Sequence, residues 1–232
     1  MAKKSNLEQD QNEQFSAAEA FVNKNRKYVI GAIVAVVVLG LGWYLYHQYV
    51  SVPRENKAST ELAKGQEYFM AEQFDKALNG DGATFAGFKR IADDYSSTDA
   101  GNLANLYAGL CEANLGKWQE AVNYLESFDT SSDAIISPNA VDALGNAYAH
   151  INQLDKAVEC FKKAASMADK ASKDGVNNTL SPHYLLQAGE VLESQGKKAD
   201  ALEIYQKIKK DYLNSYTVQT KQIDAYIERA SR

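Results

Sequence analysis

The sequence has few of the side chains that carry catalysis or hold metal ions. Its 232 residues include three histidines and two cysteines, and none of them lies in a cluster with the spacing of metal ligands. No serine or cysteine has the sequence context of an activated nucleophile, and no glycine-rich phosphate-binding loop is present. These absences argue against an enzyme, a cofactor, a metal site and a small-molecule substrate.

Positive charge is also scarce. Residues 53–232 carry 20 Lys and Arg against 26 Asp and Glu, whereas residues 1–52 carry five basic and four acidic side chains. An acidic domain is repelled by phosphate backbones, so nucleic acid is disfavoured as a partner. The same repulsion disfavours a domain that lies flat on anionic lipid.

One long run has no charged residue. Residues 28–52 contain no Asp, Glu, Lys or Arg, and residues 29–46 are almost wholly apolar. At about 1.5 Å per residue, such a helix crosses a bilayer core of about 30 Å. A cleaved signal peptide is the competing interpretation, but the run is too long, and bulky Trp43 and Tyr46 stand where a cleavage site needs small residues. We expect a retained transmembrane helix at residues 28–52, in contact with membrane lipid.

Basic residues set the expected orientation of this helix. Five precede the apolar run and two follow it closely: Lys3, Lys4, Lys24, Arg26, Lys27, Arg54 and Lys57. The positive-inside rule therefore places residues 1–27 in the cytoplasm and residues 53–232 across the membrane. Residues 1–22 are polar, and we expect a disordered or marginally helical tail, with a partner-binding helix as the alternative.

Residues 138–169 have the spacing of two antiparallel helices joined by a tight turn. Bulky, small and aromatic residues recur where such a pair must pack: Val141, Leu144, Gly145, Tyr148, Ala157, Phe161 and Ala164. This is the pattern of the 34-residue tetratricopeptide repeat (TPR). The small residues let two helix backbones approach, and the aromatic residues fill the space around the crossing.

The pair of small residues twelve positions apart occurs four times. The pairs are Gly65 with Ala77, Gly109 with Ala121, Gly145 with Ala157 and Gly189 with Ala201. They predict an all-α TPR solenoid in which about four helical hairpins are followed by a capping helix. The expected hairpins span residues 57–95, 98–128, 138–172 and 182–212, and the cap spans residues 216–230. Residues 79–82 are expected to interrupt the second helix of hairpin one.

Two further predictions concern single residues. Ser137 and Ser181 each precede a proline, and both are predicted to be N-cap residues with the proline in the first helical turn. Cys111 and Cys160 are expected to pack as small apolar residues and to remain free thiols. A disulfide between them in an oxidising compartment is the alternative.

The first helix of each hairpin lines the concave side of such a solenoid, which is the candidate protein-binding groove. Its usual inward positions are apolar in the first half of the domain: Leu62, Phe69, Met70, Leu103, Leu106 and Leu110. In the second half they are mostly polar: Asn139, Asp142, Asn146, His150, His183, Leu186, Glu190 and Glu193. An apolar strip that passes into a polar, acidic one suits an extended or helical peptide.

Two features bear on this groove. In one alternative, residues 79–86 cover Leu103, Leu106 and Leu110, and a partner cannot reach these three side chains. The first helices of hairpins two, three and four contain no Lys or Arg, which argues against a clamp for a peptide carboxylate.

The whole layout resembles the YfgM-type ancillary subunits of the bacterial Sec translocon. The likeness includes the segment NRKY at residues 25–28, before the apolar run, and ELAKG at residues 61–65, in the first repeat. Its most family-like portion comprises IADDY at residues 91–95, AGNLA at 100–104 and YAGLC at 107–111. The likeness covers nearly the full chain from about residue 13.

This resemblance implies a single-pass protein of the bacterial inner membrane with a periplasmic TPR domain. Its implied partners are the SecYEG translocon and a membrane-anchored periplasmic chaperone of the peptidyl-prolyl isomerase type, and its implied role is to assist proteins that leave the channel. The insertions after hairpins one and three depart from the family length. Two alternatives stay open: a TPR adaptor in envelope assembly or cell division, and a regulator that signals through residues 1–22 to a cytoplasmic partner.

Overall fold

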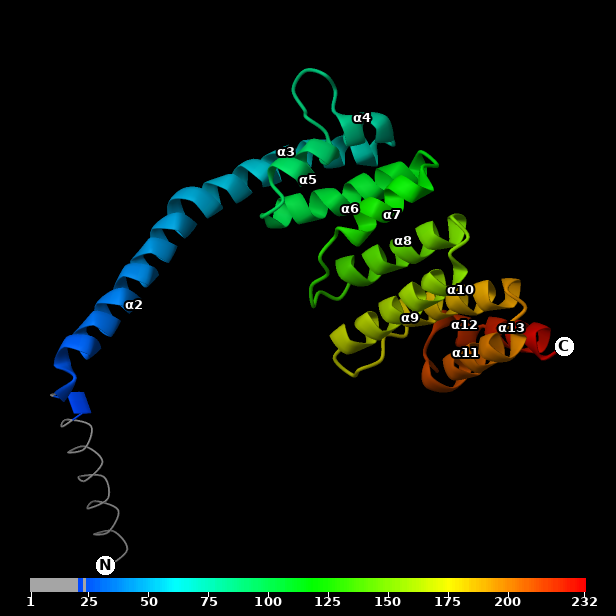
Figure 1. Ribbon diagram of the computed structural model, residues 1–232. Coiled ribbons are helices and arrows are strands. Elements are labelled where there is room, and N and C mark those ends of the chain that lie inside the picture. The colour runs from blue at the N-terminus through cyan, green and yellow to red at the C-terminus, as the bar shows by residue number, and fades with distance from the viewer. Residues whose placement is uncertain (1–20, 23) are drawn as a thin grey trace, which may run out of the picture. The chain divides into compact units, whose positions relative to one another are not determined.

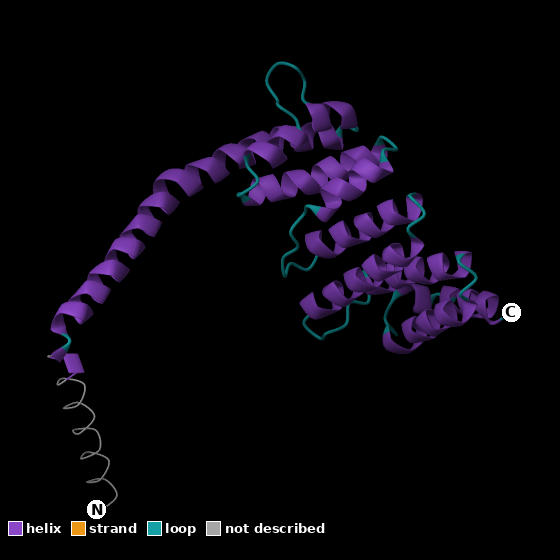
Figure 2. Cartoon of the chain, viewed as in Figure 1, coloured by secondary structure: helices purple, strands orange, loops and turns teal. Residues whose placement is uncertain are grey.

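The computed structural model describes residues 21–22 and 24–232, so most of the predicted cytoplasmic tail lies outside the described residues. The described residues form helices and no strand (Figure 2). The chain divides into two units between Arg54 and Glu55, two residues after the predicted start of the repeat domain. The two units are described in turn.

The first unit contains the apolar run. Helix α2 (Arg26–Tyr46) is followed by one turn of π-helix, η1 (His47–Ser51). No residue of α2 is buried, and the helical run that begins at Arg26 contains a stretch long and apolar enough to cross a membrane. This helix is therefore compatible with a single-pass membrane protein.

The second unit consists of helical hairpins that follow one another in chain order (Figure 1). Hairpins two, three and four each pair two helices around a tight turn, as the spacing of small residues predicts, and hairpin one has a divided second helix. The helices are α3 (Val52–Met70), α4 (Phe74–Asn79), α5 (Phe88–Asp94), α6 (Asp99–Asn114), α7 (Trp118–Glu126), α8 (Ile136–His150), α9 (Leu154–Ala171), α10 (Ser181–Ser194), α11 (Lys198–Asp211), α12 (Tyr216–Gln219) and α13 (Gln222–Ser231).

The glycine of each hairpin makes room for a large side chain from the partner helix. A methyl carbon at Gly109 would lie 2.6 Å from Cγ of Leu125, and one at Gly189 would lie 2.3 Å from Cε1 of Tyr205. Both distances are far below van der Waals contact, so a larger residue would force the helices apart. The alanine of each pair is fully buried on the partner helix.

Hairpin one departs from the regular repeat because its second helix is split into α4 and α5. Gly80 and Gly87 flank the connecting loop with φ angles of 93° and 92°, and a Cβ atom on Gly80 would lie 2.5 Å from the carbonyl oxygen of Phe85. Asp81 organises the loop, since its Oδ1 accepts hydrogen bonds from the backbone N–H groups of Ala83, Thr84 and Phe85. The predicted interruption at residues 79–82 is confirmed.

The N-cap prediction for the two serines is wrong. Ser137 and Ser181 are buried inside the first turns of α8 and α10. Helix α8 starts earlier because Asp133 accepts from N–H groups of its first turn, and Asn177 holds the turn that precedes α10. Oδ1 of Asp133 accepts from Ile135 and Ile136, and Oδ1 of Asn177 accepts from Thr179 and Leu180.

The C-terminal cap is two helices instead of the single helix expected at residues 216–230. Lys221 has a φ of 59°, in the left-handed region, and separates α12 from α13. Ile223 and Ala230 of α13 are buried in the core that hairpins two, three and four share. The described helices thus end in a short element that covers apolar surface of the last hairpin, as an open solenoid end requires.

Candidate protein-binding surfaces

The predicted groove residues differ in accessibility. Leu62 and Leu106 are buried core residues, with exposed fractions of 6% and 8%. Five side chains are exposed: Met70, Asn139, His150, His183 and Glu190. The remaining seven are half-buried: Phe69, Leu103, Leu110, Asp142, Asn146, Leu186 and Glu193. Twelve of the fourteen positions therefore keep surface that a partner could contact.

The sequence left open that residues 79–86 cover Leu106, but the burial of Leu106 has a different cause. Leu106 packs in a core cluster with residues of α7 and α8, including Val122 and Val141. Residues 79–86 do not contribute to this cluster. Leu106 is thus used to stack hairpin two on hairpin three, and it is unavailable to a peptide.

In the first hairpins the surface is aromatic as well as aliphatic. The ring of Phe69 meets Phe74 and Tyr107 edge to face, with centroid separations of 5.4 and 5.3 Å. The Nε2 atom of Gln66 donates to the hydroxyl of Tyr107 at 3.0 Å, which joins α3 to α6. Met70, 75% exposed, ends α3 beside this group in the sequence. These edge-to-face contacts hold Phe69 in one orientation.

Polar side chains join α8 to α10 through two separate sets of hydrogen bonds. The hydroxyl of Tyr184 donates to Oδ1 of Asn139 at 2.9 Å, and Nε2 of Gln187 lies 3.4 Å from Oδ1 of Asn146. Asn146 in turn donates to the backbone carbonyl of Asp142 and to its Oδ2. We call these five residues the α8–α10 polar cluster. Three of them were predicted, whereas Tyr184 and Gln187 were missed, although Gln187 lies four residues after His183 on the same helix face.

Asp142 is the electrostatically unusual member of the α8–α10 polar cluster. Burial raises the pKa of its carboxyl to about 7, because removing a charged carboxylate from water is costly. Its Oδ1 atom and Oε1 of Gln187 are both buried and have no hydrogen-bond donor among the described residues. Two acceptors without donors make this the least satisfied polar region of the first-helix surface.

His150 and His183 present imidazole rings in different settings. His150 stacks on Trp118 with a centroid separation of 3.6 Å and nearly parallel rings, which links the turn ends of hairpins two and three. Trp118 was not among the predicted residues. His183 is exposed and lies 5.9 Å from the ring of Tyr184. Of the two, only His183 is without a stacking partner in the described residues.

The acidic end of the predicted strip is covered in part by α13. Arg229 donates to both carboxylate oxygens of Glu193, and the hydroxyl of Tyr205 donates to Oε2 of Glu193 at 2.8 Å. The Arg229 guanidinium holds the pKa of Glu193 below its ordinary value. Glu193 is therefore occupied within the chain, while Glu190 stays exposed.

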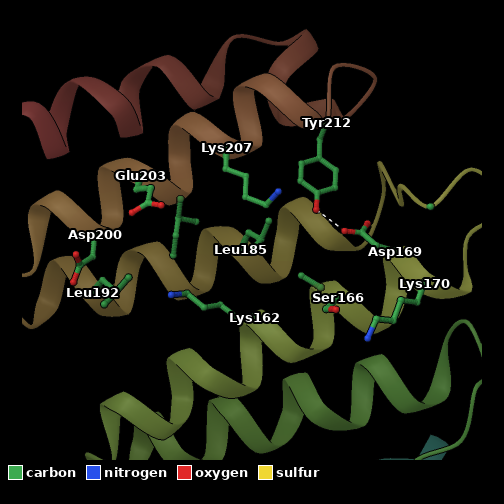
Figure 3. Close-up of a pocket in the computed structure, with 13 residues that line it drawn as sticks. Lys162, Ser166, Asp169, Lys170, Leu185, Leu192, Asp200, Glu203, Lys207 and Tyr212 are labelled. Atoms are coloured by element: carbon green, nitrogen blue, oxygen red, sulfur yellow. Dashed lines mark hydrogen bonds between the residues drawn. The ribbon is translucent and has the colours of Figure 1, made fainter.

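A hollow lies between the second helices of hairpins three and four. It has a volume of about 630 Å³, and Figure 3 shows it between α9 and α11. We call it the α9–α11 furrow. Its lining residues are Lys162, Ala165, Ser166, Asp169, Lys170, Gly175, Leu185, Leu192, Asp200, Glu203, Ile204, Lys207 and Tyr212. None of these was predicted, because neither helix alone indicates how far apart the two lie.

The described residues offer no obvious place for a metal ion or a reactive thiol. They contain no group of three or more His, Cys, Asp or Glu side chains that could hold a metal. Cys111 is buried and Cys160 half-buried, and both are free thiols. Burial raises their pKa values to about 12 and about 11, so both stay protonated at neutral pH.

Comparisons with known proteins identify the repeats. One tetratricopeptide repeat family profile matches residues 103–130 and 184–215, and another matches residues 140–174. The chain thus carries TPRs in hairpins two, three and four. No curated protein sequence matches the chain at a significant level.

Solved structures agree on the fold. The chain is similar to nearly identical TPR-like repeats of a kinesin light chain candidate from Podosopora anserina, in a form with a single substitution and in a form without it. The TM-scores are 0.53 and 0.52, the identity is 12% in both, and each match covers 76% of this chain and 94% of the other. The fold is therefore a TPR-like solenoid, a class of proteins whose concave surfaces bind other proteins.

Proposed function

We propose that this protein is a non-enzymatic scaffold anchored in the bacterial inner membrane, with its N-terminus in the cytoplasm and its TPR domain in the periplasm. In this proposal residues 28–52 are the transmembrane helix, and the first-helix surface of the repeats binds protein partners. The proposed partners are the SecYEG translocon and a membrane-anchored periplasmic chaperone of the peptidyl-prolyl isomerase type. The protein would assist exported or membrane proteins as they leave the channel.

One observation carries the proposal. An apolar helix without a buried residue precedes a TPR solenoid within the same chain, and Glu55, the first residue of the repeat unit, follows the uncharged run closely. A short connection keeps the repeats near the surface of the membrane in which the helix sits. Tethering makes the second contact effectively intramolecular, with local concentrations on the order of millimolar. Weak contacts then suffice for a stable assembly.

The first-helix surface supports a peptide partner of mixed character. It offers Met70 and Phe69 in its first part, and Asn139 and His183 in its later part. Helices α6, α8 and α10 contain no Lys or Arg, so the surface of hairpins two, three and four has no cationic group on its first helices to bind a terminal carboxylate. An internal segment of a partner, with apolar and hydrogen-bonding side chains, suits it better than a chain end.

Purification from membranes tests the proposal. The full chain is isolated from detergent-solubilised membranes, and the accompanying proteins are identified. We expect SecY and a peptidyl-prolyl isomerase chaperone to accompany it, and a variant whose TPR domain is deleted after Pro53 to lose the chaperone. If SecY is absent in every mild detergent tried, the translocon assignment is wrong, and a role as an adaptor in envelope assembly or cell division replaces it.

A second measurement separates the scaffold from a cytoplasmic signalling role. Residues 1–22 are removed while the basic residues Lys24, Arg26 and Lys27 and the apolar run are kept. A scaffold that acts through its repeats keeps its partners and its function after this deletion. Loss of function with the partners still bound would favour the regulator that signals through the tail.

A further inference from the structure

The α9–α11 furrow lies between two second helices that run in the same direction. The C-terminal ends of α9 and α11 are neighbours, because the hydroxyl of Tyr212, just after α11, donates to Oδ2 of Asp169 near the end of α9 at 2.6 Å. Figure 3 shows this bond at one end of the furrow and Asp200 at the other. The furrow therefore follows both helix axes.

Each wall of the furrow is one face of a helix. The lining residues of α9 span residues 162–170 and those of α11 span residues 200–207, mostly at spacings of three and four. Eight residues of helix correspond to roughly 12 Å at 1.5 Å per residue. The furrow is thus about as long as two helical turns.

The floor of the furrow is apolar. Leu185 and Leu192 of α10 lie beneath the two walls, and Ala165 and Ile204 complete the floor. These four side chains are only 2–6% exposed, so they form a closed apolar base whose outer atoms border open space of about 630 Å³.

The rims carry charges of opposite sign that are not paired with each other. Lys162 and Lys170 stand on α9, and Asp200 and Glu203 stand on α11 (Figure 3). In the described part of the chain none of these four forms an ion pair or a hydrogen bond through its side chain. Charges next to them are paired, since Lys207 contacts Asp211 at 2.5 Å. The four free charges thus remain available to a molecule in the furrow.

We propose that the α9–α11 furrow binds a short amphipathic segment of a partner protein. The segment is about two helical turns long and places two apolar side chains on Leu185 and Leu192. It carries a basic residue toward Asp200 and Glu203 and an acidic residue toward Lys162 and Lys170. This inference rests on the proposed function only in that the chain binds proteins, and it adds a second surface, on the second helices.

The charges favour a peptide over a lipid or a small anion. A ligand of one sign is attracted by one rim and repelled by the other, whereas a peptide can present both signs at fixed spacing. A flat bilayer surface cannot follow a furrow that is bordered by two helices. A segment with an apolar face and two charged edges is complementary to all three parts of the furrow at once.

Photo-crosslinking in native membranes tests this inference. A photo-reactive amino acid replaces Ser166, which lines the furrow, in the full-length chain, and Gln206, exposed on α11 outside the lining, serves as the control position. We expect a discrete partner at residue 166 and none at residue 206. Mass spectrometry of the captured segment should find two apolar residues with one basic and one acidic residue within two turns.

Charge reversal provides the decisive comparison. Lys162→Glu and Asp200→Lys should each lower the yield of the adduct at least about fivefold, because a rim charge that attracted the partner now repels it. Lys163→Glu, an exposed neighbour outside the furrow, is the matched control and should leave the yield unchanged. When the acidic residue of the captured segment that faces residue 162 is replaced by a basic one, the yield of the adduct with the Lys162→Glu variant should be restored. Thermal unfolding should be the same in all variants.

Four outcomes overturn the inference. They are no adduct at residue 166, an adduct with lipid only, a captured segment without the apolar pair and both charges, and a yield that is insensitive to both reversals. The proposed function does not share this failure, because co-purification with SecY and capture from the first-helix surface do not involve residue 166.

Discussion

Phe161 lies directly over Gly145, so that a methyl carbon at residue 145 would be 2.8 Å from Cε1 of the ring and 3.1 Å from Cβ of Cys160. The glycine and the ring belong to the two helices of hairpin three, sixteen residues apart. The same separation relates Gly109 to Leu125 and Gly189 to Tyr205. The repeat therefore depends on glycine at this position, because its lack of a side chain leaves room for a large side chain from the partner helix.

Substitution Gly145→Ala should destabilise the TPR domain by about 1–3 kcal/mol, because the added carbon forces Phe161 out of its position. Phe161→Leu in the same chain should relieve part of this loss. We expect the double variant to be more stable than the sum of the single effects predicts, by about 0.5–3 kcal/mol. Denaturant unfolding of the full chain in detergent, followed by helical circular dichroism, measures all four proteins. Strict additivity would contradict the packing described for this pair.

Glu55 binds the N-terminus of α6. Its two carboxylate oxygens accept hydrogen bonds from the backbone N–H groups of Asp99 and Ala100 at 2.8 and 3.1 Å. Since a carboxylate is favourable at the positive end of a helix, Glu55→Ala should cost about 0.5–2 kcal/mol. Asn56→Ala, at the exposed neighbouring position, is the control and should change the unfolding free energy by less than about 0.5 kcal/mol. Equal effects of both substitutions would rule out the cap.

Asp142 should make stability depend on pH. Its folded-state pKa of about 7 lies above the value of 3.8 for a free side chain, so the folded state binds a proton that the unfolded state releases. The associated stability is fully present below about pH 4 and is lost as the pH rises through 7. The free energy of unfolding of the native chain relative to Asp142→Asn should therefore fall by about 1–3 kcal/mol between pH 5 and pH 8. A constant difference would show that the carboxyl is not perturbed.

The two thiols should resist alkylation. With a pKa of about 12, Cys111 has a very small thiolate fraction at pH 8, and its side chain is fully buried. Iodoacetamide should therefore label neither Cys111 nor the half-buried Cys160 in the native chain over a time that labels both in denaturant. Mass spectrometry gives the extent of labelling. Rapid native labelling of Cys111 would mean that hairpin two opens readily.

The order of the hairpins could be predicted because it depends on local spacing. Gly145 and Ala157, twelve residues apart, can approach only if a turn lies between them, and the same holds for Gly109 and Ala121. The position of the turn then fixes both helices. Even the interruption after Asn79 follows from nearby glycines, since Gly80 and Gly87 adopt φ angles that other residues avoid.

Features that depend on contacts between hairpins could not be predicted in this way. Ser181 was predicted to be an N-cap residue, but its hydroxyl donates to Asp169 and to the backbone carbonyl of Ala165, both in hairpin three. Leu106 occupies an inward position in its own repeat but is covered by hairpin three. Lys221 has no sequence signal for its left-handed conformation, which divides the C-terminal cap.

In the candidate surfaces, too, the features set by local spacing could be predicted and those set by contacts between hairpins could not. Asn139, Asp142 and Asn146 follow from helix periodicity, whereas the bonds from Tyr184 to Asn139 and from Gln187 to Asn146 appear only in the structure. The α9–α11 furrow arises only when two helices of different hairpins are placed side by side. Its opposite rims belong to separate repeats, with Lys162 on one and Asp200 on the other, so no local pattern connects them.

Photo-crosslinking from His183 in native membranes tests the central claim most directly. His183 is exposed on α10, and Gln119, exposed on the second helix of hairpin two, is the control position. If the TPR domain is an anchored scaffold that binds partners through its first helices, residue 183 captures SecY or the isomerase-type chaperone and residue 119 captures neither. Capture of these proteins at residue 119 alone, or of no protein at residue 183, would contradict the account.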